Sequence, residues 1–339
     1  MNKKIISIKR STADNAYIIL LLPAVMLSTS IKNALAISLL TGVFFALSYL
    51  ISLIVGKYLS KAIVYPTILT VLAALVILAK FVPAFWGIRV GFSATAALFF
   101  TLFLLKYITG KKRIVSVKGI LKKYLSVAVC MIALGAACEF LSFGSLLGFK
   151  IHNHPVTFFC STTGIFIILS IFAIMINLVL ANIININRTF RFGHGSVKLI
   201  AYSSAVALVL IVSTRVINDL LLNRFNASYL TVLVMCFICS IVSILIKLAD
   251  KKLQIGRTAT NLIPSVALLI AISIYNSYSS YKNILFRFAV YSLIFAASAF
   301  FCTYSNKKNN SKNPLVGAPA TLMFFAVASL MIDYLRMLI

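Results

Sequence analysis

Apolar runs of about 20 residues recur along this chain and are separated by short polar segments. A helix needs about 20 residues to cross roughly 30 Å of hydrocarbon, and in lipid every backbone N–H and C=O must be paired within its element. The runs are therefore expected to be membrane-spanning helices, since the alternating strands of a barrel are not seen. Eleven spans are predicted, over residues 16–31, 33–56, 62–82, 88–108, 119–141, 155–183, 197–221, 228–249, 258–277, 284–304 and 315–337.

The composition excludes a soluble domain of this size. Of the 339 residues, 62% are hydrophobic and only 11% are charged, and the mean hydropathy is +1.06. A typical soluble protein has about 25% charged residues. The predicted fold class is therefore an all-α polytopic membrane protein.

The formal net charge of +27 fits a membrane topology better than a nucleic-acid footprint. With the N-terminus placed in the cytoplasm, most of the 32 Lys and Arg residues fall in cytoplasmic segments, as the positive-inside rule requires. No loop is long enough to fold into a nucleic-acid-binding domain. We expect contact with the lipid bilayer, no nucleic acid, an internal N-terminus and an external C-terminus.

Charges inside the predicted spans are costly in lipid and are functional candidates by default. Lys32 is expected either to snorkel to the surface from a helix break or to fix an anionic group or a helix C-terminus. Pro23 makes such a break, or a half-spanning first helix, plausible there. Arg215 and Asp219 are four residues apart on one helix and are expected to pair.

The cysteines and histidines leave two interpretations open. Cys236 and Cys239 have the C-x-x-C spacing of metal and redox sites, but they lie in an apolar helix, where cysteine acts mainly as a small hydrophobe. His152 and His154 form an H-x-H pair, which alone offers too few ligands for a metal site. No hydrolase or ATPase motif is present.

Three stretches carry a family resemblance: "LLLPAVMLSTSIKNALAISLL" (Leu20–Leu40), "GKYLSKAIVYPTILTVLAALVILAKFVPAFWGI" (Gly56–Ile88) and "LGAACEFLSFGSLLGF" (Leu134–Phe149). They resemble the RnfA/RnfE (NqrD/NqrE) membrane subunits of Rnf and Nqr electron-transport complexes. The resemblance implies that the first span is retained rather than removed as a signal peptide, that the membrane is the cell membrane of a prokaryote, and that Glu139 is a packing or capping residue.

The second half resembles the same family more faintly, beginning at "GSVKLIAYSSAVALVLIVSTRVI" (Gly195–Ile217). Thr29–Ser38 and Gly195–Ser204 also share a Ser-apolar-Lys pattern with each other. The resemblance therefore implies a tandem, with an RnfE/NqrD-like half over 1–185 and an RnfA/NqrE-like half over 186–339. Because the second half lacks its first helix, the two halves are expected to form inverted pseudo-repeats, an arrangement that often encloses one site.

Four cysteines of the family hold a two-iron two-sulfur cluster between the subunits, since such a cluster needs thiolate ligands. Here the matching residues are Leu22, Ala97 and Val266, and the fourth position falls in the missing helix. The resemblance thus predicts that the family cluster is absent. Cys138 and Cys302 occupy equivalent positions in the two halves, and a metal or disulfide role for them is weighed against simple packing.

The resemblance implies an integral membrane subunit of an Rnf/Nqr-like or flavin-based transmembrane electron-transfer system. It would be an electron-relay or non-catalytic subunit, with other membrane or flavoprotein electron-transfer subunits as partners. The alternatives are a small-molecule or ion transporter and a structural assembly subunit. The cofactor is left open between a quinone, a flavin and none. Its expected cavity is lined by Pro23, Thr29, Lys32, Ser93, Thr95, Asn261 and Ser265.

Overall fold

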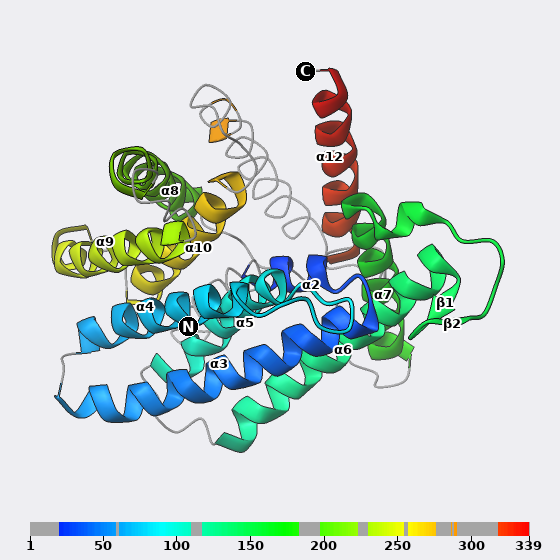
Figure 1. Ribbon diagram of the computed structural model, residues 1–339, viewed down its shortest axis with the longest axis horizontal. Coiled ribbons are helices and arrows are strands. Elements are labelled where there is room, and N and C mark those ends of the chain that lie inside the picture. The colour runs from blue at the N-terminus through cyan, green and yellow to red at the C-terminus, as the bar shows by residue number, and fades with distance from the viewer. Residues whose placement is uncertain are drawn as a thin grey trace, which may run out of the picture.

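The computed structural model describes residues 20–58, 61–109, 117–182, 197–222, 230–253, 257–275, 286, 288–289 and 318–338. These residues are mostly helical (Figure 1). The principal helices are α2 (Leu22–Leu27), α3 (Ile31–Tyr58), α4 (Lys61–Lys80), α5 (Val90–Thr109), α6 (Val117–Phe143), α7 (Thr162–Asn182), α8 (Val197–Ile217), α9 (Thr231–Leu253), α10 (Arg257–Tyr275) and α12 (Ala318–Leu338). A short hairpin, β1 (Ser145–Leu146) and β2 (Phe149–Lys150), follows α6.

The helices follow the predicted spans closely, and the chain is a membrane protein by the length and apolar character of its helices. Within the described residues, five helices are long and apolar enough to cross a bilayer: Ile31–Tyr58, Ile63–Lys80, Gly119–Phe143, Ala201–Leu220 and Thr231–Leu248. Shorter apolar helices cover Val90–Leu105, Thr162–Ile176 and Leu262–Ile272. The predicted span 284–304 lies almost entirely outside the described residues.

Two predicted spans each have one end that differs in the structure. The first is represented by α2, which ends at Leu27 before α3 begins at Ile31. The span predicted from residue 155 becomes a helix only at Thr162, after the 3-10 turn η2 (Thr157–Cys160). Ser161 caps α7, since its hydroxyl accepts a hydrogen bond from the Gly164 N–H at 3.1 Å, which is the usual role of serine at a helix N-terminus.

The helices form three groups. Helices α3, α4, α5 and α6 lie at the centre of the view, α8, α9 and α10 on one side of them, and α7 with α12 on the other (Figure 1). Helix α3 packs mainly against α5, and α8 packs mainly against α10. The first and second groups meet where α4 packs against α9, while α7 packs against α12.

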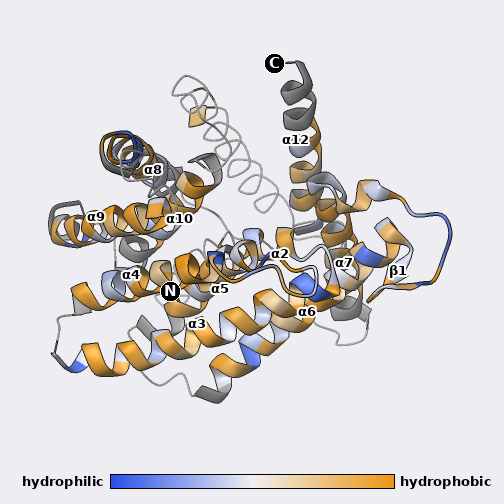
Figure 2. Cartoon of the chain, in the orientation of Figure 1, coloured by the Kyte–Doolittle hydropathy of each residue, from blue (hydrophilic) through white to orange (hydrophobic). Residues whose placement is uncertain are grey.

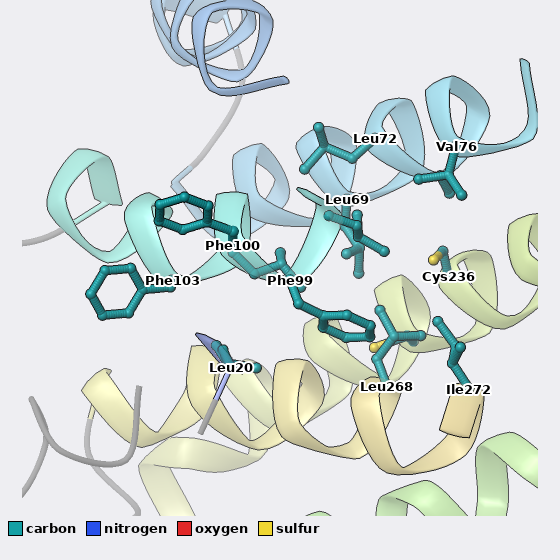
Figure 3. Packing of buried hydrophobic residues seen from close by; sticks show 14 of the residues in the cluster. Leu20, Leu69, Leu72, Val76, Phe99, Phe100, Phe103, Cys236, Leu268 and Ile272 are labelled. Carbon is teal, nitrogen blue, oxygen red and sulfur yellow. The ribbon is translucent and has the colours of Figure 1, made fainter. Parts of the chain in front are cut away.

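The main hydrophobic cluster is shared by the central group and the α8–α10 group. Figure 3 shows Phe99 of α5 pointing toward Leu268 of α10, with Leu69 of α4 nearby. Hydrophobic residues make up most of the coloured helices, and hydrophilic residues occur mainly near helix ends and in the connection after β2 (Figure 2). In lipid the interhelical contacts are stabilised by van der Waals packing and interhelical hydrogen bonds rather than by removal of apolar surface from water.

The end of α8 carries the ion pair that the sequence predicted. Arg215 Nε lies 3.4 Å from Asp219 Oδ2, an i,i+4 contact that confirms the expected pairing. Asp219 belongs to a π-helical turn, η3 (Asn218–Leu222), that continues α8.

Candidate functional site

The helix break expected near Lys32 is present at Ser28–Ser30, between α2 and α3. Nearby side chains form hydrogen bonds with some of the backbone groups at this break. The Ser28 hydroxyl donates to the Ala24 carbonyl oxygen at 2.7 Å, and the Ser30 hydroxyl accepts from the Asn33 N–H at 3.2 Å. Hydroxyl residues at a helix start commonly act in this way. Thr29, a predicted cavity residue, accepts a hydrogen bond from Asn33 Nδ2 at 3.4 Å.

Glu139 of α6 caps the start of α3. Its Oε2 accepts a hydrogen bond from the Ile31 N–H at 3.0 Å, and its Oε1 accepts one from the Leu147 N–H in the hairpin at 2.7 Å. The side chain is only 6% exposed. A carboxylate is stabilised at a helix N-terminus by the helix dipole and by unpaired N–H groups. The predicted capping role of Glu139 is therefore confirmed.

Gly135, one turn before Glu139, allows α6 to approach the break closely. A Cβ atom at Gly135 would lie 2.7 Å from the Ser30 carbonyl oxygen and 3.2 Å from that of Ser28. No real Cβ makes a contact as short as the first of these without a shift of the backbone. The lack of a side chain is therefore what brings the Glu139 carboxylate within reach of α3.

Lys32 has an aromatic partner. Its Nζ lies 4.6 Å from the centroid of the Trp86 ring, within the range of a cation–π interaction. Lys32 is half-buried and Trp86 lies in the connection from α4 to α5. From the sequence, Lys32 is expected at the surface or beside an anionic group, and the ring of Trp86 is not predicted. We call this assembly of Ser28–Ser30, Lys32, Trp86, Gly135 and Glu139 the α2–α3 junction.

Three other predicted cavity residues belong to elements at or near this junction. Pro23 lies in the first turn of α2, which packs against α5. Ser93 is buried near the start of α5, and the Thr95 hydroxyl donates to the Gly91 carbonyl oxygen at 3.0 Å. Asn261 lies in α10, and its side chain is outside the described part of the chain. Whether these residues line one cavity stays a prediction.

Ser265, the remaining predicted residue, belongs to a different polar cluster. It is 2% exposed and hydrogen bonds with the Tyr65 hydroxyl of α4. Nearby in α4, the Thr70 hydroxyl lies 3.3 Å from the Ser240 hydroxyl of α9, and the Ser240 hydroxyl also lies 3.3 Å from the Pro66 carbonyl oxygen. We call Tyr65, Pro66, Thr70, Ser240 and Ser265 the α4–α9 crossing.

Sequence reasoning did not single out Tyr65, Thr70 or Ser240. Single hydroxyl residues in apolar helices are common, and nothing in their spacing within one helix reveals a partner from another helix. The in-helix spacing does predict one bond, because a Ser or Thr hydroxyl often donates to the carbonyl four residues earlier. Ser240 makes that bond to Cys236 at 2.7 Å, and Thr70 makes it to Pro66 at 3.0 Å.

Among the described cysteines, Cys138, Cys236 and Cys239 are buried, Cys160 is half-buried and Cys130 is exposed. Cys236 and Cys239 are both fully buried in the main cluster, and the Cys239 thiol donates to the Pro264 carbonyl oxygen at 3.3 Å. Cys138 lies in a different cluster, with Leu134 among its members. Cys302 is outside the described residues. Among the described residues, no group of three or more His, Cys, Asp or Glu side chains is placed to hold a metal ion.

The residues at the family's cluster positions do not fit an iron–sulfur cluster. Ala97 and Val266 are 0% and 2% exposed and belong to the same hydrophobic cluster. Leu22 packs instead against a separate cluster that includes Phe166 and Ala326. Hydrocarbon side chains offer no thiolate or imidazole ligand. No chemistry through such a cluster is therefore derived for these positions.

His152 is held by the protein rather than directed outward as a ligand. Its Nε2 lies 2.8 Å from the Phe140 carbonyl oxygen, and its Nδ1 accepts a hydrogen bond from the His154 N–H at 3.2 Å. Its ring also contacts the Phe140 ring edge-on, with centroids 5.0 Å apart. Through these contacts with Phe140, His152 packs the segment after the hairpin against the end of α6.

Comparison of the chain with protein-family models, with curated proteins and with solved structures finds no match.

Proposed function

We propose that this chain is an integral membrane subunit of an Rnf/Nqr-like or flavin-based transmembrane electron-transfer system, built as two inverted halves and lacking the family's iron–sulfur ligands. It would act as a scaffold that holds a quinone or flavin, or that docks a partner carrying the redox group. The electron-transfer theme rests on the sequence resemblance. The helix break at Ser28–Ser30 supports only the scaffold part of the proposal, since broken helices at a repeat interface often line a binding site.

The proposed repeat pairs α3 with α8, α4 with α9, α5 with α10 and α7 with α12. The packing is consistent with this pairing. Helix α3 contacts α4 and α5, and α8 contacts α9 and α10 in the same way. The contacts of α4 with α5 are likewise matched by those of α9 with α10. The joining contacts, α4 with α9 and α7 with α12, each link a helix to its own proposed equivalent.

The direction of these joining helices is the single observation that carries the inverted layout. Along α4, Thr70 contacts Ser240, while the earlier residue Tyr65 lies under Lys247, which comes later in α9. The two helices therefore run antiparallel. A two-fold axis in the membrane plane makes equivalent helices antiparallel, whereas an axis along the membrane normal keeps them parallel.

Helices α7 and α12, the second pair that joins the two halves, also run antiparallel. The Thr163 hydroxyl of α7 lies 2.7 Å from the Ser329 hydroxyl of α12, and Ser170, later in α7, donates to the carbonyl oxygen of Pro319, earlier in α12, at 3.1 Å. Both pairs thus support inverted halves. With eleven spans, this layout corresponds to an internal N-terminus and an external C-terminus in the cell membrane of a prokaryote.

The layout can be tested by cross-linking in the intact chain. In a variant whose native cysteines are replaced by alanine, Thr70→Cys with Ser240→Cys should form a disulfide on mild oxidation. Leu78→Cys with Ser240→Cys is the matched control, because Leu78 is 63% exposed in the same helix and lies about two turns beyond Thr70. Cross-linking of the control pair in preference to the Thr70 pair would contradict the crossing and remove the support for inverted halves.

The function itself is tested by the absorption spectrum, with iron, flavin and quinone analysis, of the full chain purified gently with whatever accompanies it. Bound flavin or quinone without iron supports a rewired electron-transfer subunit. Stoichiometric iron and sulfide would contradict the interpretation of Leu22, Ala97 and Val266. A colourless protein without quinone would favour a transporter, the alternative that broken helices at a repeat interface also fit.

A further inference from the structure

The connection between α4 and α5, residues 81–89, exposes large apolar side chains. Phe81 is 64% exposed, Phe85 72% and Trp86 58%. Exposed apolar residues gathered in one short segment mark an interaction surface more often than scattered single ones do. The charged residues at its two ends, Lys80 and Arg89, are exposed as well.

The backbone of this connection forms a tight turn at Trp86 and Gly87, and Trp86 there has a strained, left-handed conformation. Trp86 has φ of +52° and Gly87 has φ of +73°, and the Ile88 N–H donates to the Phe85 carbonyl oxygen at 2.9 Å. Two successive positive φ values are the pattern of a type I′ turn, which favours Asn, Asp and Gly at both central positions. A left-handed conformation costs a bulky residue about 1–2 kcal/mol, so Trp86 is an unexpected choice for this turn.

The Lys32 contact accounts for only part of this cost. A cation–π interaction at an exposed site stabilises by about 0.5–1 kcal/mol. It also leaves more than half of the indole surface exposed. A strained residue of this kind points to a further contact that the ring makes.

The position of the connection identifies the contacting surface. It joins α4, which is long and apolar enough to span a bilayer, to the apolar helix α5 only ten residues further along the chain. A connection this short between two such helices must lie at the boundary of the bilayer. Trp is enriched at that depth because its ring is apolar and its N–H is polar, and Lys and Arg reach the lipid phosphates from there.

We propose that the 81–89 connection anchors the protein in the headgroup region of the bilayer. The rings of Phe81, Phe85 and Trp86 insert among the lipids, Lys80 and Arg89 face anionic phosphates, and Lys32 holds the indole at this depth. The proposal depends on the chain being a membrane protein and not on its role in electron transfer.

Trp86 is the single tryptophan of the chain, so intrinsic tryptophan fluorescence reports on this connection alone. The full chain is reconstituted into vesicles of phosphatidylcholine and phosphatidylglycerol that carry bromine either near the headgroup or near the bilayer centre. We expect the strongest quenching by bromine near the headgroup, and weak quenching by acrylamide added to the water.

The Lys32→Met variant should lose part of the lipid quenching and gain acrylamide quenching, because the ring is no longer held. Leu39→Met is the matched control: Leu39 is 69% exposed on the same helix, and its replacement should leave both signals unchanged. Strong acrylamide quenching of the unmodified chain without lipid quenching would overturn the proposal. So would resistance to both quenchers, which would mean that protein covers the ring.

Discussion

The α2–α3 junction and the α4–α9 crossing both pair polar groups inside an apolar protein, but they use different chemical groups to do so. The junction uses a carboxylate, a lysine and helix-end N–H groups. The interhelical hydrogen bonds of the crossing join neutral hydroxyls and carbonyl oxygens, and its charged contact is Lys247, which lies over the Tyr65 ring. The junction lies where helices begin and end, while the crossing lies along uninterrupted helices. The difference indicates that charge is confined to places where it can be capped or can reach the membrane surface, as its cost in lipid requires.

The largest effect is expected for Glu139→Ala. This change leaves the N–H groups of Ile31 and Leu147 without their carboxylate acceptor. A buried orphaned group costs about 1–3 kcal/mol, and the cost is smaller at Leu147, which is 44% exposed. The melting temperature in detergent, followed with a dye that reacts with cysteines as they become exposed, should fall sharply. Glu139→Gln keeps an acceptor oxygen and should fall less. Equal melting of Glu139→Ala and the unmodified chain would show that the cap contributes nothing.

A smaller loss is expected for Gly135→Ala. The added Cβ would contact the Ser30 carbonyl oxygen at 2.7 Å, so α6 must move away from the break, at a cost of about 1–3 kcal/mol for overpacking. Gly56→Ala in α3 is the control, because no atom lies within 4 Å of its added Cβ. There the change should be neutral or stabilise by about 0.5–1 kcal/mol, since alanine favours a helix. Equal melting temperatures of the two variants would show that the close approach of α6 to the break does not require glycine at position 135.

The junction was partly foreseeable from the sequence, and the crossing was not. The charge of Lys32 in an apolar run marked it as a candidate, and Pro23 in a short first span predicted a broken helix, whose position at Ser28–Ser30 only the structure gives. The spans were predictable because hydrophobic length is a local property. Contacts such as Trp86 on Lys32 depend on a turn conformation and on packing between distant segments, which no local pattern encodes.

At the crossing, Thr70→Val together with Ser240→Ala should cost less than either junction variant. Hydrogen bonds between membrane helices contribute on average about 0.6 kcal/mol each, because the separated helices also find partners for their hydroxyls. A double-mutant cycle on melting free energy should give a coupling of that order between the two residues. A coupling as large as the Glu139→Ala loss would remove the distinction between charged and neutral connections.

The smallest effect is expected at Lys32, the residue that the sequence marked most clearly, through its contact with Trp86. Lys32→Met removes the cation but keeps an apolar stem, and an exposed cation–π pair is worth about 0.5–1 kcal/mol. Trp86→Asn removes the ring and suits the left-handed turn, so its lost contacts are partly offset by relief of strain. In a cycle with both variants, the coupling energy should therefore remain near 0.5 kcal/mol even if the single variants differ in sign. A much larger coupling would mean that Lys32 supports the junction itself, and the conspicuous charge would then matter for stability as much as the buried glutamate does.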